Sequence, residues 1–362
     1  MPAPRTPERP RRRSGLDALA VAPGLEPMEA KLVEELPQGS GWQFEPKWDG
    51  FRCLAFRAGD EVELQAKSGK SLTRFFPEMA MALLQLPARR FVLDGELAIA
   101  VGGSLSFKAL QDRLHPAESR VRRLAAEQPA MLILFDCLMT SDGEDLTPQT
   151  LSQRRKALER FHREQAPQAS LRLSPATDDL QQARAWLERA GGALDGVVAK
   201  RLDEPYQPGV RAMLKIKRMR TADCVVGGFR YLSDERLVGS LLLGLYDASG
   251  KLDHVGFTST ITDVERPELT RRLEALIEAP GFTGDAPGGP SRWSNGRSAD
   301  WRPLRPELVA EVRYDHVSGG RFRHGTRLLR WRPDKSPRQC GLEQLQAEAR
   351  PGELIRRMID PA

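Results

Sequence analysis

The hydrophobic pattern of the chain predicts a mixture of helices and strands over its first 218 residues. The segment 177–192 predicts a helix because its apolar residues recur every three or four positions, with Thr177 or Asp178 as the candidate cap and Gly191 as the candidate end. Apolar runs of strand length lie at 91–99, 131–138 and 194–200. Each run contains a carboxylate, so we expect acidic side chains within a sheet.

Beyond residue 218 the pattern changes to short strands separated by turns. Regularly spaced strands with turn signals predict a small five-stranded barrel, which is a common nucleic-acid-binding surface. The glycine- and proline-rich segment 279–296 predicts a long loop. The predicted strands lie at 223–232, 237–246, 252–260 and 308–317, with a turn at 247–250. The fold class is therefore α+β, with a mixed domain over residues 25–218, a barrel over 219–345 and a tail over 346–362.

Length and charge agree with two domains and a polyanionic partner. A chain of 362 residues exceeds the usual size of one core, and its net charge of +6 favours nucleic acid. Residues 1–24 predict a flexible basic arm, because the first 13 residues contain five arginines, four prolines and few apolar residues. A solvated tail is the common interpretation of such an arm, and a phosphate-binding arm is the alternative.

Cysteine spacing and apolar run lengths indicate a cytoplasmic protein. The four cysteines are far apart and form no Cys-x-x-Cys pair, so neither a zinc ribbon nor a disulfide framework is predicted. The longest apolar runs, such as 240-SLLLGLY-246, are shorter than the roughly 20 residues that a membrane-spanning helix needs. We therefore expect no contact with a membrane.

The stretch 44-FEPKWDGFRC-53 carries two charges in a run that otherwise favours burial. The Asp49-Gly50 dipeptide predicts a hairpin turn, with Lys47 before it and Arg52 after it. A desolvated lysine near other cations can be a nucleophile, whereas a lysine with a buried stem and a solvated amine is more common. The pattern K-x-D-G-x-R resembles the nucleophile motif of the covalent nucleotidyltransferases, the superfamily of DNA ligases, RNA ligases and mRNA capping enzymes.

Further segments resemble the other motifs of this superfamily and occur in the same order. They are 93-LDGEL-97, 134-LFDCL-138, 195-DGVVAK-200, 214-LKIK-217 and 332-RPDK-335. The resemblance implies that residues 25–218 form a nucleotidyltransferase adenylation domain of ATP-grasp-like fold, followed by an OB-fold barrel over 219–345. Order along the chain carries more weight here than any single motif, because each motif alone is short.

The resemblance also implies roles for individual residues. Lys47 would be the nucleophile that attacks ATP, and Glu96 and Asp195 would hold Mg²⁺, with Mn²⁺ as an alternative ion. Lys215 and Lys217 would alternate on one strand and bind phosphate. Asp94 and Asp136 are expected to be structural carboxylates that bond backbone groups. The predicted nucleotide-binding residues are Glu45, Arg52, Lys67, Glu96, Phe135, Lys200, Arg211, Lys215, Lys217, Arg332 and Lys335.

Two segments depart from the superfamily pattern. Asp195 stands where a glutamate is usual, and Lys67 in 66-AKSGKS-71 is the nearest cation to the usual arginine of the motif after the nucleophile. The Gly-Lys-Ser ending of that segment does not make a P-loop, because the first glycine of a P-loop would fall on Leu64. Lys67 is therefore assigned to the ribose by position alone.

Longer runs resemble one branch of the superfamily, the compact C type of bacterial ATP-dependent DNA ligases, which is related to the ligase module of ligase D. These runs are 206–229 and 307–335. The resemblance implies a monomer that seals nicks in duplex DNA during repair, near the nucleoid, with bacterial Ku or other repair proteins as partners. Basic residues of the barrel that would contact DNA phosphates are Arg321, Arg323, His324 and Arg327. An RNA or end-repair polynucleotide ligase, or a non-catalytic relative that binds nucleic acid, are the alternatives.

Overall fold

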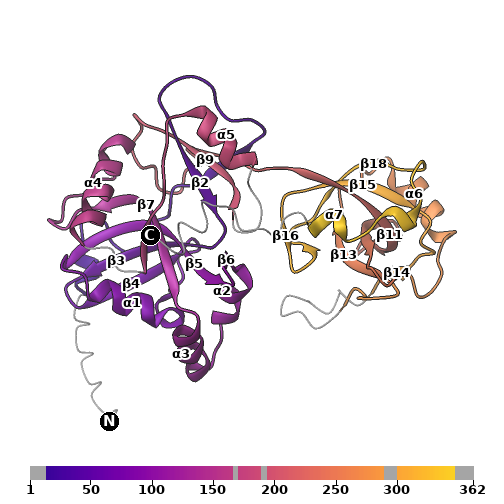
Figure 1. Cartoon of the computed structure of the whole chain (residues 1–362), viewed down its shortest axis with the longest axis horizontal. Coiled ribbons are helices and arrows are strands. Elements are labelled where there is room, and N and C mark those ends of the chain that lie inside the picture. The colour runs from indigo at the N-terminus through magenta and orange to yellow at the C-terminus, as the bar shows by residue number, and fades with distance from the viewer. Residues whose placement is uncertain (1–13, 166–169, 189–193, 289–299, 347–362) are drawn as a thin grey trace, which may run out of the picture. The chain divides into compact units, whose positions relative to one another are not determined.

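The computed structural model describes residues 14–165, 170–188, 194–288 and 300–346. The chain forms two compact units, of which the first ends at Ile216 and the second begins at Lys217 (Figure 1). Most of the predicted arm and tail, including all the arginines of the first 13 residues, lies outside the described residues. The described part of the arm is packed rather than extended, since Val21 is 5% exposed and Leu16 and Leu19 pack around the same cluster.

The larger sheet of the first unit has the strand order β4-β3-β5-β7-β8. Both faces of its central strands are buried, because Cys53 and Ala55 pack on one side while Leu54 and Phe56 pack on the other. Helices α1, α2 and α4 cover the first of these faces. The strands are β3 (Phe51–Ala58), β4 (Glu61–Ala66), β5 (Arg90–Val101), β7 (Ala130–Met139) and β8 (Leu171–Leu173), with the short β6 (Ser104–Leu105) paired to β5. The helices are α1 (Pro77–Leu84), α2 (Phe107–Arg113), α3 (Glu118–Glu127) and α4 (Leu151–Glu164).

The smaller sheet has the strand order β1-β10-β9-β2 and packs against the larger one. Trp48 and Val197 of the smaller sheet share a buried cluster with Ala98 and Ile133 of the larger sheet. Helix α5 closes this cluster with Ala183 and Trp186. The elements are β1 (Ala30–Val33), β2 (Trp42–Trp48), β9 (Leu194–Arg201), β10 (Met213–Ile216) and α5 (Leu180–Glu188).

The predicted hairpin at Asp49-Gly50 is wrong. Strand β2 pairs with β9 in the smaller sheet, whereas β3 pairs with β4 and β5 in the larger one. The dipeptide therefore carries the chain from one sheet to the other. Glycine is needed at position 50 for space, because a Cβ atom there would lie 2.1 Å from the carbonyl oxygen of Leu97 and 2.8 Å from Cγ of Glu96.

The other elements predicted for this unit are largely confirmed. The runs at 91–99, 131–138 and 194–200 are β5, β7 and β9. Helix α5 begins later than predicted, because Asp179 rather than Thr177 or Asp178 accepts the N–H of Gln181, at 2.8 Å. The predicted helix end at Gly191 lies outside the described residues.

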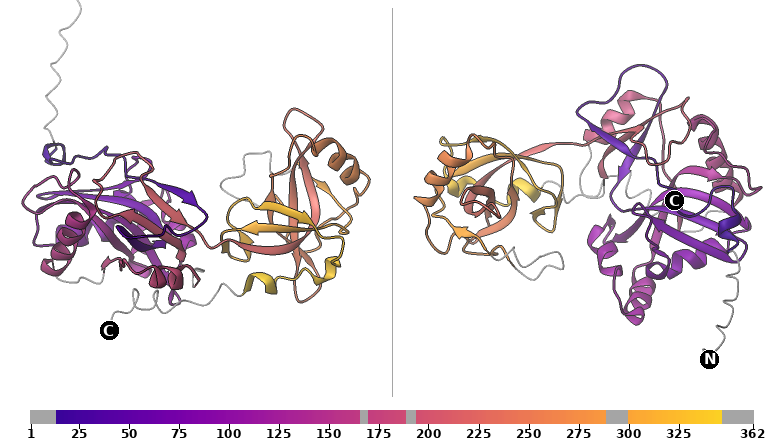
Figure 2. Two further views of the ribbon diagram at one scale, coloured as in Figure 1. Left: turned by 90° about the horizontal axis from the view of Figure 1, so that it is seen from above. Right: turned by 180° about the vertical axis from the view of Figure 1, so that it is seen from behind.

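The second unit is a five-stranded barrel with the order β13-β12-β11-β15-β18 (Figure 2). A parallel bridge between Thr258 and Thr326 joins the two outer strands and closes it. The first, second and third strands form a meander, the fourth returns beside the first, and the fifth runs parallel to the third, which is the OB-fold arrangement. The elements are β11 (Arg220–Tyr231), β12 (Val238–Tyr246), β13 (Leu252–Thr258), α6 (Arg266–Glu274), β15 (Val309–Tyr314) and β18 (Arg327–Trp331), with short pieces β14 (Arg302–Pro303), β16 (Val317–Ser318), β17 (Arg321–Phe322) and α7 (Glu343–Gln346).

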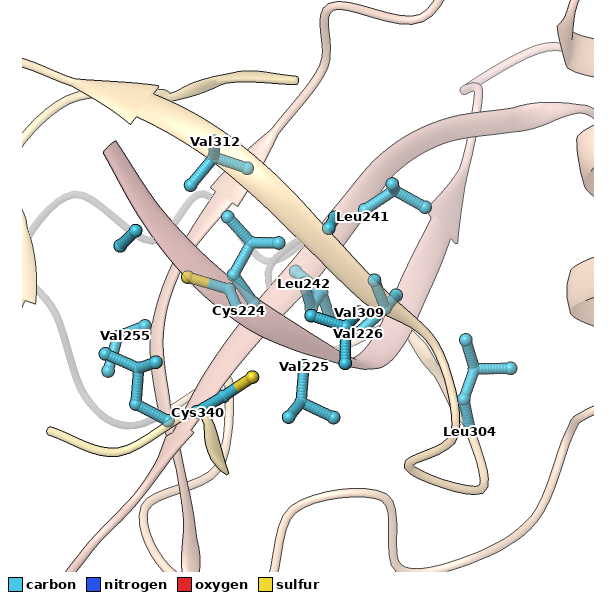
Figure 3. Close-up of a cluster of buried hydrophobic side chains, with 14 of the residues drawn as sticks. Cys224, Val225, Val226, Leu241, Leu242, Val255, Leu304, Val309, Val312 and Cys340 are labelled. Atoms are coloured by element: carbon cyan, nitrogen blue, oxygen red, sulfur yellow. The ribbon is translucent and has the colours of Figure 1, made fainter. Parts of the chain in front are cut away.

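The barrel encloses its own apolar core (Figure 3). Cys224, Leu242 and Val312 are fully buried in it, together with Cys340 from the segment after the last strand. The predicted strands and the predicted barrel are thus confirmed, while part of the predicted loop 279–296 lies outside the described residues. Among the described residues, no helix has the length and apolar character that crossing a membrane would require.

Candidate active site

A cavity of about 220 Å³ opens in the first unit, with walls from both sheets. Strands β2, β9 and β10 of the smaller sheet form one wall, and β3, β5 and β7 of the larger sheet form the other. Most of the residues predicted from the sequence therefore converge on one space. Those that line it are Glu45, Lys47, Arg52, Lys67, Glu96, Phe135, Lys200 and Lys215.

Lys47 lies in the wall formed by the smaller sheet. Its Nζ atom is 2.7 Å from Oδ2 of Asp195, and the two side chains are 26% and 8% exposed. The contact follows from the pairing of β2 with β9, in which Trp48 lies opposite Leu194. Asp195 is therefore placed to orient the amine of Lys47 from the neighbouring strand.

Glu96 lies in the opposite wall, on β5. Its Oε1 accepts the N–H of Gly50 at 3.1 Å, which ties the end of the crossing segment to the larger sheet. Burial raises the pKa of this carboxyl to about 7, the positive charges of Lys47 and Arg52 oppose the rise, and Asp49 and Asp94 add to it. Glu96 is half-buried beside other acids, and its carboxylate would gain from a nearby cation.

Arg52 is fixed by Asp94 through two hydrogen bonds of 2.6 Å. Burial opposes the charge of the guanidinium, but the attraction of Asp94 outweighs it and raises the pKa of Arg52. Tyr206 donates its hydroxyl to the same carboxylate at 2.8 Å. The prediction that Asp94 bonds backbone groups is wrong, because its partners are side chains and it holds Arg52 toward the cavity. Asp136 bonds both the backbone N–H of Cys137, at 3.0 Å, and the guanidinium of Arg154.

Phe135 lies among cations at the same wall. The guanidinium carbon of Arg52 is 4.6 Å from its ring centre and Nζ of Lys200 is 4.7 Å from it. Lys200 is also 2.9 Å from Oε2 of Glu45, and both of these side chains are less than 5% exposed. Gln43 donates to the other oxygen of Glu45 at 2.7 Å. The ion pair of Glu45 and Lys200 is therefore almost entirely buried, although both residues line the cavity.

Glu29 was missed by the sequence reasoning, although it gathers two of the predicted residues. Its carboxylate is 2.9 Å from Nζ of Lys67 and 3.6 Å from Nε of Arg211. The hydrogen bond from Lys67 lowers the pKa of Glu29. Arg211 does not line the cavity itself and reaches its rim through Glu29. Nothing in the local sequence pattern distinguishes Glu29 from a solvated acid.

Lys215 and Lys217 do not share a strand, so that prediction is wrong. Strand β10 ends at Ile216, and Lys217 begins the second unit. Lys215 lines the cavity. Lys217 donates to Oδ2 of Asp315 at 2.6 Å, and the same carboxylate is 3.0 Å from Nδ1 of His324. These hydrogen bonds lower the pKa of Asp315 although burial of its carboxyl acts in the opposite direction.

Arg332 and Lys335 of the closing motif lie in the second unit and converge on one acid. Asp223 is 3.0 Å from Nη1 of Arg332 and 2.7 Å from Nζ of Lys335. Asp334 of the same motif pairs with Nη2 of Arg332 at 2.8 Å. The sequence reasoning identified both cations and missed Asp223, which is 109 residues from Arg332.

The basic segment 321–327 lies on the same barrel and is partly engaged within it. Arg321 contacts Nδ1 of the buried His254, and His324 is held by Asp315. Arg327 is exposed on β18, where it lies opposite Arg313 of β15. Arg327 is therefore the residue of this group with the clearest access to a polyanion.

The carboxylates near Lys47 would suit a Mg²⁺ ion. Glu96 in the cavity wall and Asp195, which contacts Lys47 but does not line the cavity, would supply hard carboxylate oxygens, and Mg²⁺ is typically held by one or two carboxylates together with substrate phosphates. Within the described parts of the chain, no group of three or more histidine, cysteine or acidic side chains is arranged to hold a metal. The phosphates of a bound nucleotide would therefore have to complete the coordination.

A cavity that holds Lys47, paired with the carboxylate of Asp195, together with Glu96 and the ring of Phe135, followed by an OB-fold barrel, has the features of a nucleotidyltransferase adenylation domain with its C-terminal domain. Comparison with known families agrees. Residues 27–217 match the family described as ATP dependent DNA ligase domain, and residues 234–335 match the ATP dependent DNA ligase C terminal region. The chain therefore belongs to the ATP-dependent DNA ligases.

Individual relatives place it within this family. The chain is 45% identical over 346 residues to DNA ligase C2 of Mycolicibacterium smegmatis, covering 91% of this chain and 96% of that protein. It is 43% identical to DNA ligase C of Mycobacterium tuberculosis, covering 91% of this chain and 95% of that protein. A solved structure from a study of Lig E DNA ligases shares the fold, with a TM-score of 0.52 at 15% identity over 84% of this chain and 99% of that chain. The resemblance to the C type ligases is confirmed.

Proposed function

We propose that this protein seals nicks in duplex DNA with ATP, through lysyl-AMP and DNA-adenylate intermediates, with Lys47 as the nucleophile. The observation that carries the proposal is the convergence of Lys47, Arg52, Glu96 and Lys215, from two sheets, on one cavity. DNA ligation with ATP is the activity of the family to which the chain belongs. The residue assignments are our own and rest on the geometry of this cavity.

The first step forms a bond between Lys47 and the α-phosphate of ATP. The unprotonated Nζ atom attacks the α-phosphorus and the N–P bond forms. The bond to the bridging oxygen breaks so that pyrophosphate leaves with the electron pair, and the nitrogen releases one proton to solvent. Asp195 holds the amine in place before attack, and Lys215 contributes positive charge at the cavity wall. Mg²⁺, or Mn²⁺ in its place, would neutralise charge on the phosphates when held by Glu96 and Asp195.

Two further steps complete the reaction. The 5′-phosphate at the nick attacks the phosphorus of lysyl-AMP and releases Lys47, which gives adenylated DNA. The 3′-hydroxyl then attacks the 5′-phosphate, the new phosphodiester bond forms, and AMP leaves. The protein returns to its starting state with the free amine of Lys47, so one ATP is consumed for each sealed nick.

The remaining side chains of the cavity recognise the nucleoside. Phe135 stacks on the base, Glu45 and Lys200 bind its polar edge, and Arg52 binds the ribose. Lys67 and Arg211, gathered by Glu29, complete the rim near the ribose. An adenine would offer a flat apolar face to Phe135 and hydrogen-bonding groups at its edge.

The second unit supplies cations for the leaving group and for DNA. We assign residues 25–218 to the adenylation domain and 219–345 to the OB-fold domain. Lys217, beside this boundary, and Arg332 and Lys335 of the OB-fold domain bind the phosphates of ATP during the first step. Arg323 and Arg327 contact DNA phosphates in the later steps. The protein acts as a monomer in the cytoplasm, close to the nucleoid, in DNA repair with bacterial Ku or other repair proteins.

Labelling with ATP carrying a radioactive α-phosphate tests the nucleophile. Incubation with Mg²⁺ and without DNA should attach AMP to the wild-type protein, and Lys47→Ala should remain unlabelled because it lacks the attacking amine. Lys31→Ala is the matched control, since Lys31 is an exposed lysine on β1, at the other edge of the same sheet, and should label normally. Equal labelling of Lys47→Ala and wild type would disprove the assignment.

Substrate choice is tested by comparing nicked DNA, nicked RNA and hybrid duplexes at equal concentration. Sealing of nicked DNA at the highest rate is the expected result. Preferential sealing of RNA would instead identify an RNA ligase, and absence of lysyl-AMP in the wild-type protein would identify a non-catalytic relative that binds nucleic acid. Mg²⁺ and Mn²⁺ are compared in the same assay.

A further inference from the structure

Asp223 lies where the two basic residues of the closing motif meet. Its carboxylate accepts hydrogen bonds from Nη1 of Arg332 at 3.0 and 3.2 Å, and Oδ2 accepts one from Nζ of Lys335 at 2.7 Å. The exposed fractions are 12% for Asp223, 19% for Arg332 and 24% for Lys335. One largely shielded carboxylate thus contacts both cations, and Asp334 holds the guanidinium of Arg332 from a second side, at 2.8 Å.

The strand order of the barrel explains why these groups meet. Asp223 is on β11, opposite Glu311 of β15, and β15 also pairs with β18, which ends one residue before Arg332. The segment that carries the two cations leaves β18 in a turn, in which the N–H of Lys335 donates to the carbonyl of Arg332 at 3.2 Å. The cations follow the end of a strand, whereas Asp223 sits within one.

The main chain of Asp223 is held independently of its carboxylate. Its N–H donates to Oε1 of Gln344 at 3.0 Å, and its carbonyl accepts from Nε2 of the same side chain at 3.1 Å. Gln344 belongs to α7, which follows the closing motif in the chain. Strand pairing fixes the backbone of Asp223, Gln344 adds two hydrogen bonds to it, and the carboxylate is a fixed point against which Arg332 and Lys335 are ordered.

We propose that Asp223 is a positioning residue for lysyl-AMP formation, because its carboxylate holds the Arg332 guanidinium and the Lys335 ammonium as a preformed pair for the departing pyrophosphate. The inference rests on the proposed function, in which these two cations bind pyrophosphate. Two neighbouring cations repel each other, and each long side chain loses conformational entropy when it binds. A shared carboxylate reduces both costs before the reaction begins, which is how preorganised charge accelerates a step.

Asp223→Asn tests this, since it keeps the size and one acceptor oxygen but removes the charge and presents an amide donor to one of the cations. The rate of lysyl-AMP formation should fall about tenfold, as expected for a misplaced positioning group. The pyrophosphate concentration that half-reverses preformed lysyl-AMP should rise by a similar factor. Asp223→Glu, which keeps the charge, should recover part of both losses.

Sealing of a pre-adenylated nick separates positioning from folding. No pyrophosphate takes part in that step, while the barrel must still be folded to bind DNA, so Asp223→Asn should seal at the wild-type rate. Gln344→Ala is the matched control, because it removes the two bonds to the main chain of Asp223 and leaves the carboxylate in place. It should form lysyl-AMP normally.

Several outcomes would overturn the proposal. Asp223→Asn could form lysyl-AMP at or above the wild-type rate, lose both lysyl-AMP formation and sealing together, or be reproduced by Gln344→Ala. Arg332→Ala and Lys335→Ala show whether the proposed function fails instead. If Arg332→Ala and Lys335→Ala slow lysyl-AMP formation and Asp223→Asn does not, only the proposed role of Asp223 is disproved. If none of the three variants slows lysyl-AMP formation, the role assigned to the closing motif is disproved as well.

Discussion

Arg52 and Asp94 join neighbouring strands of the larger sheet through two hydrogen bonds of 2.6 Å. Arg52 lines the cavity between the two sheets. Asp94→Asn should leave the cation without its charge partner, at a cost of about 3 kcal/mol in the free energy of unfolding. It should also raise the KM for ATP in lysyl-AMP formation. Chemical denaturation and initial rates measure the two effects.

Tyr206→Phe is the matched control for this change. It removes the 2.8 Å hydrogen bond to Asp94 and the 2.9 Å hydrogen bond from the N–H of Met28, but keeps the carboxylate and its contact with Arg52. A loss of about 2 kcal/mol, with little change in the KM for ATP, is expected for two hydrogen bonds. If the two variants raise the KM equally, the ion pair is not what holds Arg52 for binding.

Gly50→Ala should disturb catalysis strongly, because its Cβ would overlap the carbonyl of Leu97 and Cγ of Glu96. The crossing segment must then move away from β5, which displaces Lys47 relative to Glu96, and lysyl-AMP formation should fall at least about 100-fold. Gly15→Ala is the control, since its nearest neighbour would be an ordinary 3.5 Å contact with Cβ of Ala58. A fully active Gly50→Ala protein would refute the tight crossing.

Glu45 and Lys200 form a buried pair whose partners cannot be removed singly without loss. Glu45→Gln should destabilise the first unit by about 3 kcal/mol, because it leaves the ammonium of Lys200 in a site that is 4% exposed. Combining Glu45→Gln with Lys200→Met should recover much of that stability, although nucleotide binding should stay weak. Chemical denaturation of wild type, the single variant and the double variant measures these stabilities. A double variant less stable than the single variant would contradict the expected recovery.

Acid should destabilise the barrel through His254. Burial, with the charges of Arg321 and Arg230, lowers the pKa of His254 to about 3. Between about pH 6.5 and 3, the unfolded chain therefore binds a proton at His254 that the folded protein does not. The free energy of unfolding should decrease as the pH is lowered through that window, by up to about 1.4 kcal/mol per pH unit. Denaturation at pH 7.5 and 5.5 should show a smaller difference for His254→Asn than for wild type. Identical differences would show that His254 is not the group responsible.

DNA affinity should depend on salt through the exposed face of the barrel that carries Arg327. Arg327→Ala should weaken binding of nicked duplex and reduce the slope of log affinity against log salt by about one, as for the loss of one phosphate contact. Arg236→Ala is the control, because Arg236 is exposed on the same unit but pairs with Glu274 at 2.9 Å. Unchanged slopes for Arg327→Ala would place the DNA contact elsewhere.

The sequence predicted the strands and most of the cavity for physical reasons that can be named. Strands β5, β7 and β9 are apolar runs of the length typical of buried strands. Each run contains an acidic or basic residue, so predicting the strand also predicted where that residue lies. Glu96, Phe135 and Lys200 therefore reached the cavity as expected. Motif order then led to the proposal that Lys47 is the nucleophile, which a lone lysine could not support.

The errors came from contacts between distant parts of the chain. Asp49-Gly50 suits a tight turn, but the strands on either side pair with different partners, and local turn chemistry does not specify pairing. Asp94 and Tyr206 are 112 residues apart, and Asp223 and Arg332 are 109 apart. Such partners are ordinary acids and hydroxyls in the sequence, so only the assembled sheets distinguish them.

The crossing at Asp49-Gly50 has a consequence for protein engineering. Lys47, the proposed nucleophile, and Glu96 lie on separate sheets, so their alignment depends on how those sheets pack together. That packing is made by Val197, Ala98 and Ile133, which are buried and do not line the cavity. Repacking these apolar positions offers a way to retune the speed of self-adenylation while every group that touches the nucleotide stays unchanged.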